Sequence, residues 1–145
     1  MPEDYSDYFG QLLKRKEEAV SVRFREVESE GWRPCANDCH NNVDEWTVRH
    51  PKSRAVRGWL FRQPDETGRY TFMAHSVTEE NGRLVDITPI DENTPREALW
   101  FLRHSGNEVE FQAMKTACSR VVYPPITMDE WRAWQTVPID EPPDL

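Results

Sequence analysis

The sequence predicts an α+β domain in which helices precede and follow an antiparallel sheet. Two observations predict it. Segments with apolar residues at every third or fourth position lie toward both ends of the chain, and the segment between about residues 55 and 88 has strand-like alternation. Separate runs of helices and strands are typical of α+β folds. The 145 residues suffice for one hydrophobic core, so we expect a single domain over 1–136 and a flexible, acidic, Pro-rich tail over 137–145.

Composition excludes several classes of protein. The net charge of −8 argues against a nucleic-acid partner, because phosphate backbones are bound by clustered Lys and Arg. The N-terminus lacks the pattern of a signal peptide, and no apolar run has the length of a membrane span. Three cysteines are an odd number, which excludes a full disulfide framework and favours a reduced, cytoplasmic setting. A single Cys35–Cys39 or Cys39–Cys118 disulfide remains an alternative. The oligomeric state is not predicted.

The N-terminal segment predicts a helix over about Asp4–Ser29, either continuous or broken near Val20. It contains no proline, and Gly31-Trp32-Arg33-Pro34 ends it. Its apolar face at helical spacing consists of Tyr5, Tyr8, Phe9, Leu12 and Leu13.

A second helix is predicted over Cys39–Arg49. Asp38 is its expected N-cap and Asn37 a weaker one. Val43 and Trp46 would point inward, and His50-Pro51 would end the helix because the residue before a proline disfavours the helical conformation.

Three strands are predicted next, over 55–62, 69–78 and 83–88. Asn81-Gly82 between the last two is a strong hairpin signal. Further helices are predicted from Thr94, as a cap with Pro95 at the first helical position, to Gly106, then over 108–117, and over Thr127–Trp134.

The hairpin brings a histidine and a carboxylate together. With a two-residue loop, Glu80 pairs with Arg83, and His75 lies on the face of Asp86, displaced by two residues; with a four-residue loop, His75 lies directly opposite Asp86. Either register lets the carboxylate bind one ring nitrogen of the histidine, which fixes the tautomer and stabilises the imidazolium. The pattern therefore predicts a general base with its orienting carboxylate.

Cys39 is the candidate nucleophile for that base. A thiolate in the first turn of a helix faces unpaired N–H groups and the positive end of the helix dipole, and a neighbouring His⁺ lowers its pKa further. The same N–H groups could stabilise the oxyanion of a tetrahedral intermediate.

These segments resemble the transglutaminase-like branch of the papain-like cysteine enzymes. The resemblance rests on CHNNVDEW, RAVRGWLF and MAHSVTEENGRLVDITP, that is, a Cys opening a helix, a Gly-containing strand, a His strand and an Asp-x-Thr strand. It covers residues 37–89, the core of the expected domain. It implies a papain-like or transglutaminase-like fold with additional C-terminal helices, in which Cys39 is the nucleophile, His75 the general base and acid, and Asp86 the orienting residue of a catalytic triad.

The implied activity is acyl transfer from an amide through a Cys39 thioester, without a cofactor. The substrate would be a peptide, a protein or a small amide, and the enzyme a protease, a deamidase or amidase, or a transglutaminase. Many papain-like enzymes have a side-chain oxyanion donor shortly before the cysteine, where this chain has Arg33-Pro34. Asn37, Trp32 and His40 are the candidate oxyanion or substrate-binding residues. Since adjacent helix residues do not face each other, we expect His40 to be a poor base for Cys39.

Three other interpretations remain open. Cys39 could be a small buried residue, because free cysteine is among the most buried residue types. The domain could be a non-catalytic protein-binding module with the same fold. Cys35, Cys39 and His40 could bind zinc, although structural zinc sites combine two close ligand pairs and only one such pair is present here.

Overall fold

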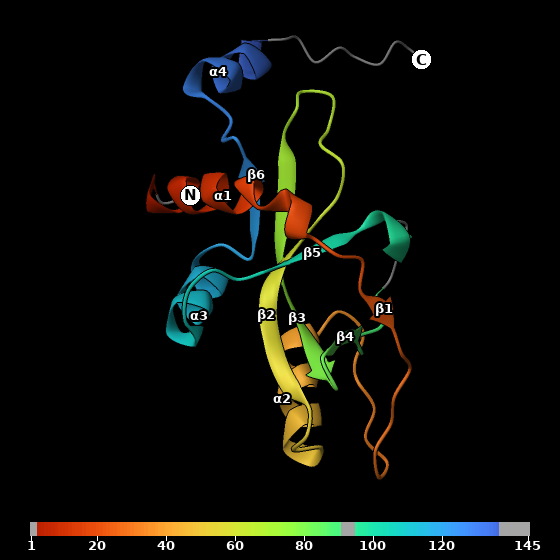
Figure 1. Ribbon diagram of the computed structural model, residues 1–145. Coiled ribbons are helices and arrows are strands. Elements are labelled where there is room, and N and C mark those ends of the chain that lie inside the picture. Colours follow the sequence, from red (N-terminus) through yellow and green to blue (C-terminus); the bar gives the residue numbers. More distant parts are fainter. Residues whose placement is uncertain (1–2, 91–94, 137–145) are drawn as a thin grey trace, which may run out of the picture.

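The computed structural model describes residues 3–90 and 95–136, and it has an α+β fold of one mixed sheet with four α-helices in that part of the chain (Figure 1). The long strands β2 (Arg54–Phe61) and β3 (Tyr70–Glu80) run side by side through the middle. The sheet order is β1-β4-β3-β2-β5, and β6 also pairs with β3. The α+β class predicted from the sequence is confirmed, whereas the expected 137–145 tail lies outside the described residues.

The predicted N-terminal helix is much shorter than expected. Helix α1 spans Glu3–Lys14, a 3₁₀ turn covers Lys16–Glu18, and the short strand β1 (Arg23–Phe24) pairs in parallel with β4. The prediction of helix up to Ser29 is therefore wrong. The backbone beyond the 3₁₀ turn finds its hydrogen-bond partners in the sheet, since Val20 exchanges two bonds of 3.0 and 2.8 Å with Phe101. Sheet pairing overrides local helix propensity here.

Helix α2 spans Cys39–Arg49, with the bounds that the sequence predicts. Val43 and Trp46 are buried, as expected, and pack against Ile87, which lies at the end of the hairpin. Asp38 occupies the N-cap position, but its side chain makes no capping bond in the described part of the chain; it accepts instead from Asn41 Nδ2 at 3.0 Å. The predicted cap is thus right in position and wrong in its bonding.

The hairpin between β3 and β4 (Arg83–Asp86) has the two-residue loop, one of the two predicted registers. Glu80 pairs with Arg83 and Thr78 with Val85. Asn81 and Gly82 both have positive φ, of 54° and 77°. A type I′ turn requires this conformation, and it matches the twist of the strands, which explains the choice of register.

One edge of β3 is shared between two strands. Strand β4 pairs with Thr78–Glu80, while β6 (Arg120–Tyr123) pairs with Tyr70–Met73. The stretch 74–77 lies between these two pairings, and α2 contacts β3 within it, since His40 Nδ1 lies 2.6 Å from Ser76 Oγ. Figure 1 shows α2 beside the lower part of the sheet. The first turn of α2 can therefore reach β3 at its edge.

The region after the hairpin contains a strand where a helix is predicted. A 3₁₀ turn (Arg96–Ala98) is followed by β5 (Trp100–Arg103), which pairs antiparallel with β2. The prediction of a helix from Thr94 to Gly106 is wrong, and Thr94 itself lies outside the described residues. Phe101 and Leu102 are both 1% exposed, one on each face of the sheet, which a strand between two layers can satisfy.

Helix α3 (Glu108–Ala117) has the predicted bounds, with Asn107 and Glu110 forming a capping box. With α1 it covers the main hydrophobic core on one face of the sheet, and both helices lie on the same side in Figure 1. The fully buried residues of this core include Phe9, Trp59, Phe72 and Phe111. Strand β6, which follows α3, is not predicted from the sequence.

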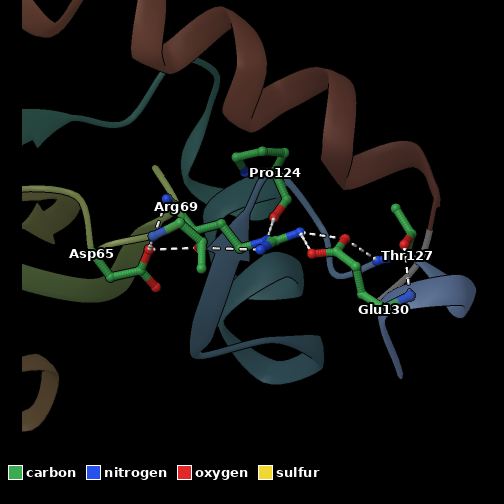
Figure 2. A network of polar contacts seen from close by, with 6 residues as sticks. Asp65, Arg69, Pro124, Thr127 and Glu130 are labelled. Atoms are coloured by element: carbon green, nitrogen blue, oxygen red, sulfur yellow. Dashed lines mark hydrogen bonds and ion pairs between the residues drawn. The ribbon is translucent and has the colours of Figure 1, made fainter. Parts of the chain in front are cut away.

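Helix α4 (Met128–Thr136) lies near the β2–β3 loop and is tied to it by Arg69 (Figures 1 and 2). Arg69 Nη2 donates to both carboxylate oxygens of Glu130 at 2.5 and 2.6 Å, and Arg69 Nε donates to Pro124 O at 3.0 Å. The predicted cap at Thr127 is confirmed, because Glu130 N donates to its Oγ1 at 3.1 Å. This network anchors the end of the described chain away from the cysteine.

Candidate functional site

Cys39 is the first residue of α2 and is 8% exposed. The loop before it is held by two contacts. Asn37, with a φ of 61°, donates its backbone N–H to Pro89 O at 2.9 Å, and the Asn42 side chain bonds both backbone groups of Cys35. The thiol is therefore placed at a helix N-terminus whose preceding loop is hydrogen-bonded to the segment that follows β4, the strand that carries Asp86.

His75 and Asp86 form a buried pair, each 4% exposed. His75 Nε2 lies 2.7 Å from Asp86 Oδ2, and the second carboxylate oxygen accepts from Thr88 N at 3.0 Å. A carboxylate only accepts, so Nε2 donates and Nδ1 is the ring nitrogen left for another partner. The Cys39 thiol is near enough to this ring for each group to shift the pKa of the other. The structure thus brings Cys39, His75 and Asp86 together in the predicted order.

The two reactive groups shift each other's protonation. Burial alone would raise the pKa of the Cys39 thiol, but the polar contacts and the positive charges of His40 and His75 lower it to about 6. Burial alone would lower the pKa of His75, but its hydrogen bonds and ion pairing with Asp86 and Cys39 raise it to about 9. Between these values the pair is a thiolate beside an imidazolium, which is the reactive form of a nucleophilic cysteine.

His40 is a second influence on the thiol, since it helps to lower the pKa of Cys39. Its Nδ1 lies 2.6 Å from Ser76 Oγ, and Ser76 is fully buried on the β3 face opposite to that of His75. Arg57 Nη1 donates to the same oxygen at 2.9 Å. The bond to Ser76 fixes the imidazole of His40 against β3.

Two further residues bond to the groups of the site and are not among the predicted site residues. Arg96 Nη1 donates to Asp86 Oδ2 at 3.0 Å, and its Nη2 donates to Thr88 O. Asn42 is 3% exposed, and its Nδ2 also donates to Thr88 Oγ1 at 3.0 Å. Asn42 could have been predicted from the sequence, because it is a polar residue on the same side of the helix as the apolar Val43 and Trp46. Arg96 has no comparable sign, because the stretch 91–94 separates it from the hairpin.

The other two predicted oxyanion candidates lie differently. The Asn37 side chain is exposed on the loop directly before the helix. Trp32 packs against Trp46 with ring centroids 6.5 Å apart, and Arg49 lies over it at 5.4 Å. Trp46 is two helical turns beyond Cys39, about 10 Å along the axis. Trp32 therefore packs beside the third turn of α2, and the expectation that it serves the thiol is not supported by its position.

Small cavities adjoin the site on the side of the loop and of Asp86. One of about 50 Å³ is lined mainly by apolar residues of β1 and of the loops that meet at Asn37, with Arg33 at its margin: Phe24, Glu26, Val27, Arg33, Pro34, Ile87 and Pro89. A smaller one of about 10 Å³ touches Asp86 and Arg96.

No three His, Cys, Asp or Glu side chains gather into a metal-binding group within the described ranges. The zinc alternative of Cys35, Cys39 and His40 is thus not formed there. Cys35, Cys39 and Cys118 are all free thiols, so neither suggested disulfide is present.

Among the helices that the structure describes, none has the length and apolarity to cross a membrane. No protein-family model, no curated protein and no solved structure matches this chain.

Proposed function

We propose that this chain is a cysteine-dependent acyl-transfer enzyme, similar to the transglutaminase-like and papain-like cysteine enzymes, which acts on an amide through a Cys39 thioester. The observation that carries the proposal is the buried pair beside the thiol: His75 Nε2 lies 2.7 Å from Asp86 Oδ2, and the Cys39 thiol is near enough to the His75 ring for each to shift the pKa of the other. Nucleophile, base and orienting carboxylate in mutual contact are the requirement of this chemistry.

The reaction proceeds in two halves. The Cys39 thiolate attacks the amide carbonyl carbon, forming a C–S bond while the carbonyl electrons move to oxygen. When the tetrahedral intermediate collapses, the C–N bond breaks and the His75 imidazolium gives its proton to the leaving amine. The resulting thioester is attacked by water or by an amine, from which His75 takes a proton, and the thiolate is released.

The start of α2 supplies electrostatic stabilisation. The first-turn N–H groups of a helix lack intrahelical partners and point toward anions. Because the Asp38 side chain bonds Asn41 and not this backbone, it does not compete with an incoming oxyanion. A tetrahedral oxyanion on the carbon bonded to Cys39 would meet these donors.

The buried charges favour an enzyme over a binding module with the same fold. Burying ionised groups costs several kcal/mol per ion by desolvation, which pairing offsets only in part. The site buries a thiolate, an imidazolium and a carboxylate, with side-chain exposures of 6% for His75 and 5% for Asp86. Their desolvation lowers the stability of the fold. A surface used solely for protein contact gains nothing from it.

The test uses a protein in which Cys35 and Cys118 are replaced by Ser, so that Cys39 is the remaining thiol. The pH dependence of alkylation by iodoacetamide should have its midpoint at about 6. In the His75→Ala variant the midpoint should rise toward the value of a free thiol, about 8.5, while the effect of His40 on the thiol remains. Incubation with p-nitrophenyl acetate should release nitrophenolate in a burst and leave one acetyl group on Cys39, detected by mass spectrometry.

A Cys39 that alkylates with the midpoint of a free thiol, and that His75→Ala leaves unchanged, would rule out the enzyme and favour the binding module. Given an acyl-enzyme, ammonia or amine release from peptides with and without an added amine assigns the acceptor. Water as acceptor makes a protease, a deamidase or an amidase, and an amine makes a transglutaminase.

A further inference from the structure

A cavity of about 290 Å³ lies at the end of the sheet where β2 meets the loop to β3. Its volume is close to the ~300 Å³ at which small-molecule sites begin. Phe61, which lines it, comes after Gly58, the partner of His75 in β2, and lies about 10 Å farther along the strand. The cavity is thus separate from the catalytic residues and takes no part in the function proposed above.

Three aromatic side chains form the apolar wall of this cavity. Phe61 is 2% exposed and belongs to the main core, and Tyr70 and Trp100 are half-buried and pack against it. Their rings are inclined to that of Phe61 by 69° and 54°, with centroids 6.1 and 5.7 Å away. Because the rings are inclined to one another, they can contact a bound ring edge-to-face, an arrangement that aromatic pairs prefer.

The layer that covers the sheet changes character beside these rings. Phe61 and Trp100 are cross-strand partners at the end of β2 and the start of β5, and Tyr70 is the first residue of β3. Helix α1 has ended before this point, and the 3₁₀ turn after it supplies Lys16 and Glu17 to the lining. The rings are therefore faced by a charged turn and not by the apolar side of a helix, which leaves the space between them unfilled.

Lys16 and Glu17 bring opposite charges to the rim of the cavity, and both are exposed. In the part of the chain that the structure describes, neither side chain has an ion-pair partner, so they do not neutralise each other there. In that same part, the Tyr70 hydroxyl and the Trp100 indole N–H have no hydrogen-bond partner. The lining thus combines an apolar wall with a cation, an anion and neutral donors that a ligand could satisfy.

This combination favours a ligand that carries both charges. An organic cation would meet the like charge of Lys16, and an organic anion would meet that of Glu17, which opposes the binding of either. A zwitterion meets an opposite charge at each residue. The volume of the cavity limits such a molecule to about the size of one amino acid.

We propose that the cavity is a binding site for a free aromatic amino acid. Its ring packs against Phe61, Tyr70 and Trp100. Its carboxylate pairs with Lys16 and its ammonium pairs with Glu17, each through a charge-assisted hydrogen bond. The ligand is thereby recognised by its two charges and by its ring together.

Binding is measured by titrating ¹⁵N-labelled protein with L-phenylalanine at pH 7. The backbone amide signals of Glu17 and Gln63 and the indole N–H signal of Trp100 should shift and saturate with one dissociation constant. The indole signal is assigned by its loss in Trp100→Phe. Phenethylamine, which lacks the carboxylate, and 3-phenylpropionate, which lacks the ammonium, should bind about 5-fold more weakly or worse, because each loses one exposed ion pair and meets a like charge.

Charge variants assign each group of the ligand to its residue. Glu17→Gln should weaken the binding of phenylalanine about 5-fold and leave that of 3-phenylpropionate no weaker, because this ligand has no ammonium to lose. Lys16→Gln should weaken phenylalanine similarly and leave phenethylamine no weaker. Lys14→Gln and Glu66→Gln, at exposed positions outside the lining, are the matched controls and should leave all three affinities unchanged. Since all four positions are exposed, the variants should fold, which thermal unfolding confirms.

Three results would overturn the proposal. Shifts that do not saturate, or that centre on Cys39 and His75, would show that the cavity does not bind the amino acid. Phenethylamine or 3-phenylpropionate binding as tightly as phenylalanine would show that a single charge is recognised. Glu17→Gln and Lys16→Gln variants with wild-type affinity for phenylalanine would show that the rim charges take no part. None of these results bears on acyl transfer, which is tested by the alkylation and acylation of Cys39.

Discussion

His75 and Asp86 are in hydrogen-bond contact, at 2.7 Å, although they are not cross-strand partners. Thr78 pairs with Val85, so the register continued by one residue puts Val77 opposite Asp86, and His75 is displaced from it by two residues on the same face. Diagonal neighbours of this kind lie within reach of long side chains. The offset lets the imidazole reach past the carboxylate toward the start of α2, so one ring can bond Asp86 and lie near Cys39.

Acyl transfer should depend on pH through both members of this ion pair. The lowered pKa of Cys39, about 6, means that thiolate forms as the pH rises through that value, and the raised pKa of His75, about 9, means that imidazolium is lost as the pH rises through it. The rate of amide cleavage should therefore be bell-shaped with limbs near these values, whereas alkylation should follow the acid limb alone. Steady-state rates from pH 5 to 10 check this. A bell whose acid limb lies near 8.5 would contradict the thiolate–imidazolium pair.

Replacing Arg96 by Gln should raise the pKa of His75 further. The Arg96 guanidinium donates to the same carboxylate oxygen as His75 and brings a positive charge close to the imidazolium. Removal of that charge lets His75 hold its proton more firmly, so the basic limb should move above about 9. An NMR titration of His75 measures the shift directly. Arg54→Gln, on the exposed end of β2, is the control and should leave it unchanged; a downward shift in Arg96→Gln would refute the assignment.

Asn42→Ala should loosen the loop that carries the cysteine. The Asn42 side chain makes three hydrogen bonds, two to the backbone of Cys35 and one to Thr88 Oγ1, and its loss leaves buried partners unsatisfied. We expect the free energy of unfolding to fall by about 1–3 kcal/mol and the alkylation midpoint of Cys39 to rise. Urea unfolding measures the first effect. Asn41→Ala, at the neighbouring exposed position, should lower the free energy of unfolding by less than about 0.5 kcal/mol. Equal losses of stability in the two variants would show that the Asn42 side chain does not hold the loop.

Gly58→Ala should be among the most destabilising small substitutions in the chain. Gly58 lies opposite His75 in the β2–β3 ladder, and a Cβ there would overlap the carbonyl oxygen of Leu102 and the Phe101 ring. Because backbone cannot move aside cheaply, we expect a loss of about 3 kcal/mol or more. Gly68→Ala meets no atom within 4 Å and carries the strain of a positive φ alone, about 1–2 kcal/mol. Urea unfolding of the two variants measures both losses of stability. Similar losses would show that a Cβ fits at position 58.

Glu80→Gln should reduce stability at neutral pH and flatten its acid dependence. Burial would raise the pKa of Glu80, but hydrogen bonds from Ser53, Trp46 and Arg25 lower it from 4.5 to about 2. A depressed carboxyl pKa stabilises the folded state above the ordinary value and loses that contribution as the pH falls toward 2. We expect wild type to exceed the variant by about 1–3 kcal/mol at pH 7 and the difference to shrink below pH 4. Urea unfolding across that range checks this, with exposed Glu66→Gln as control; a constant difference would contradict it.

The parts of the fold that could be predicted from sequence are those with local causes. The bounds of α2 and α3 follow from their apolar spacing and from the residues that flank them. The Asn81-Gly82 turn sets the register of β3 and β4, which in turn places His75 beside Asp86. Where prediction failed, in the stretch after α1 and around β5, the segments pair with strands distant in sequence. Their helical propensity was outweighed by sheet pairing that no local pattern reveals.

The sequence by itself determined that a thiol begins a helix and that a tight hairpin carries a histidine and a carboxylate on one face. These features depend on interactions over a few residues. Only the tertiary structure decided that β4 and β6 divide one edge of β3, so that the start of α2 contacts the stretch between their pairings and its thiol lies near His75. The contacts of Asn42, Ser76, Arg57 and Arg96 arise there as well. They join residues far apart in the chain, and their partners are set by which strand edges and buried polar groups remain to be satisfied once the sheet has formed.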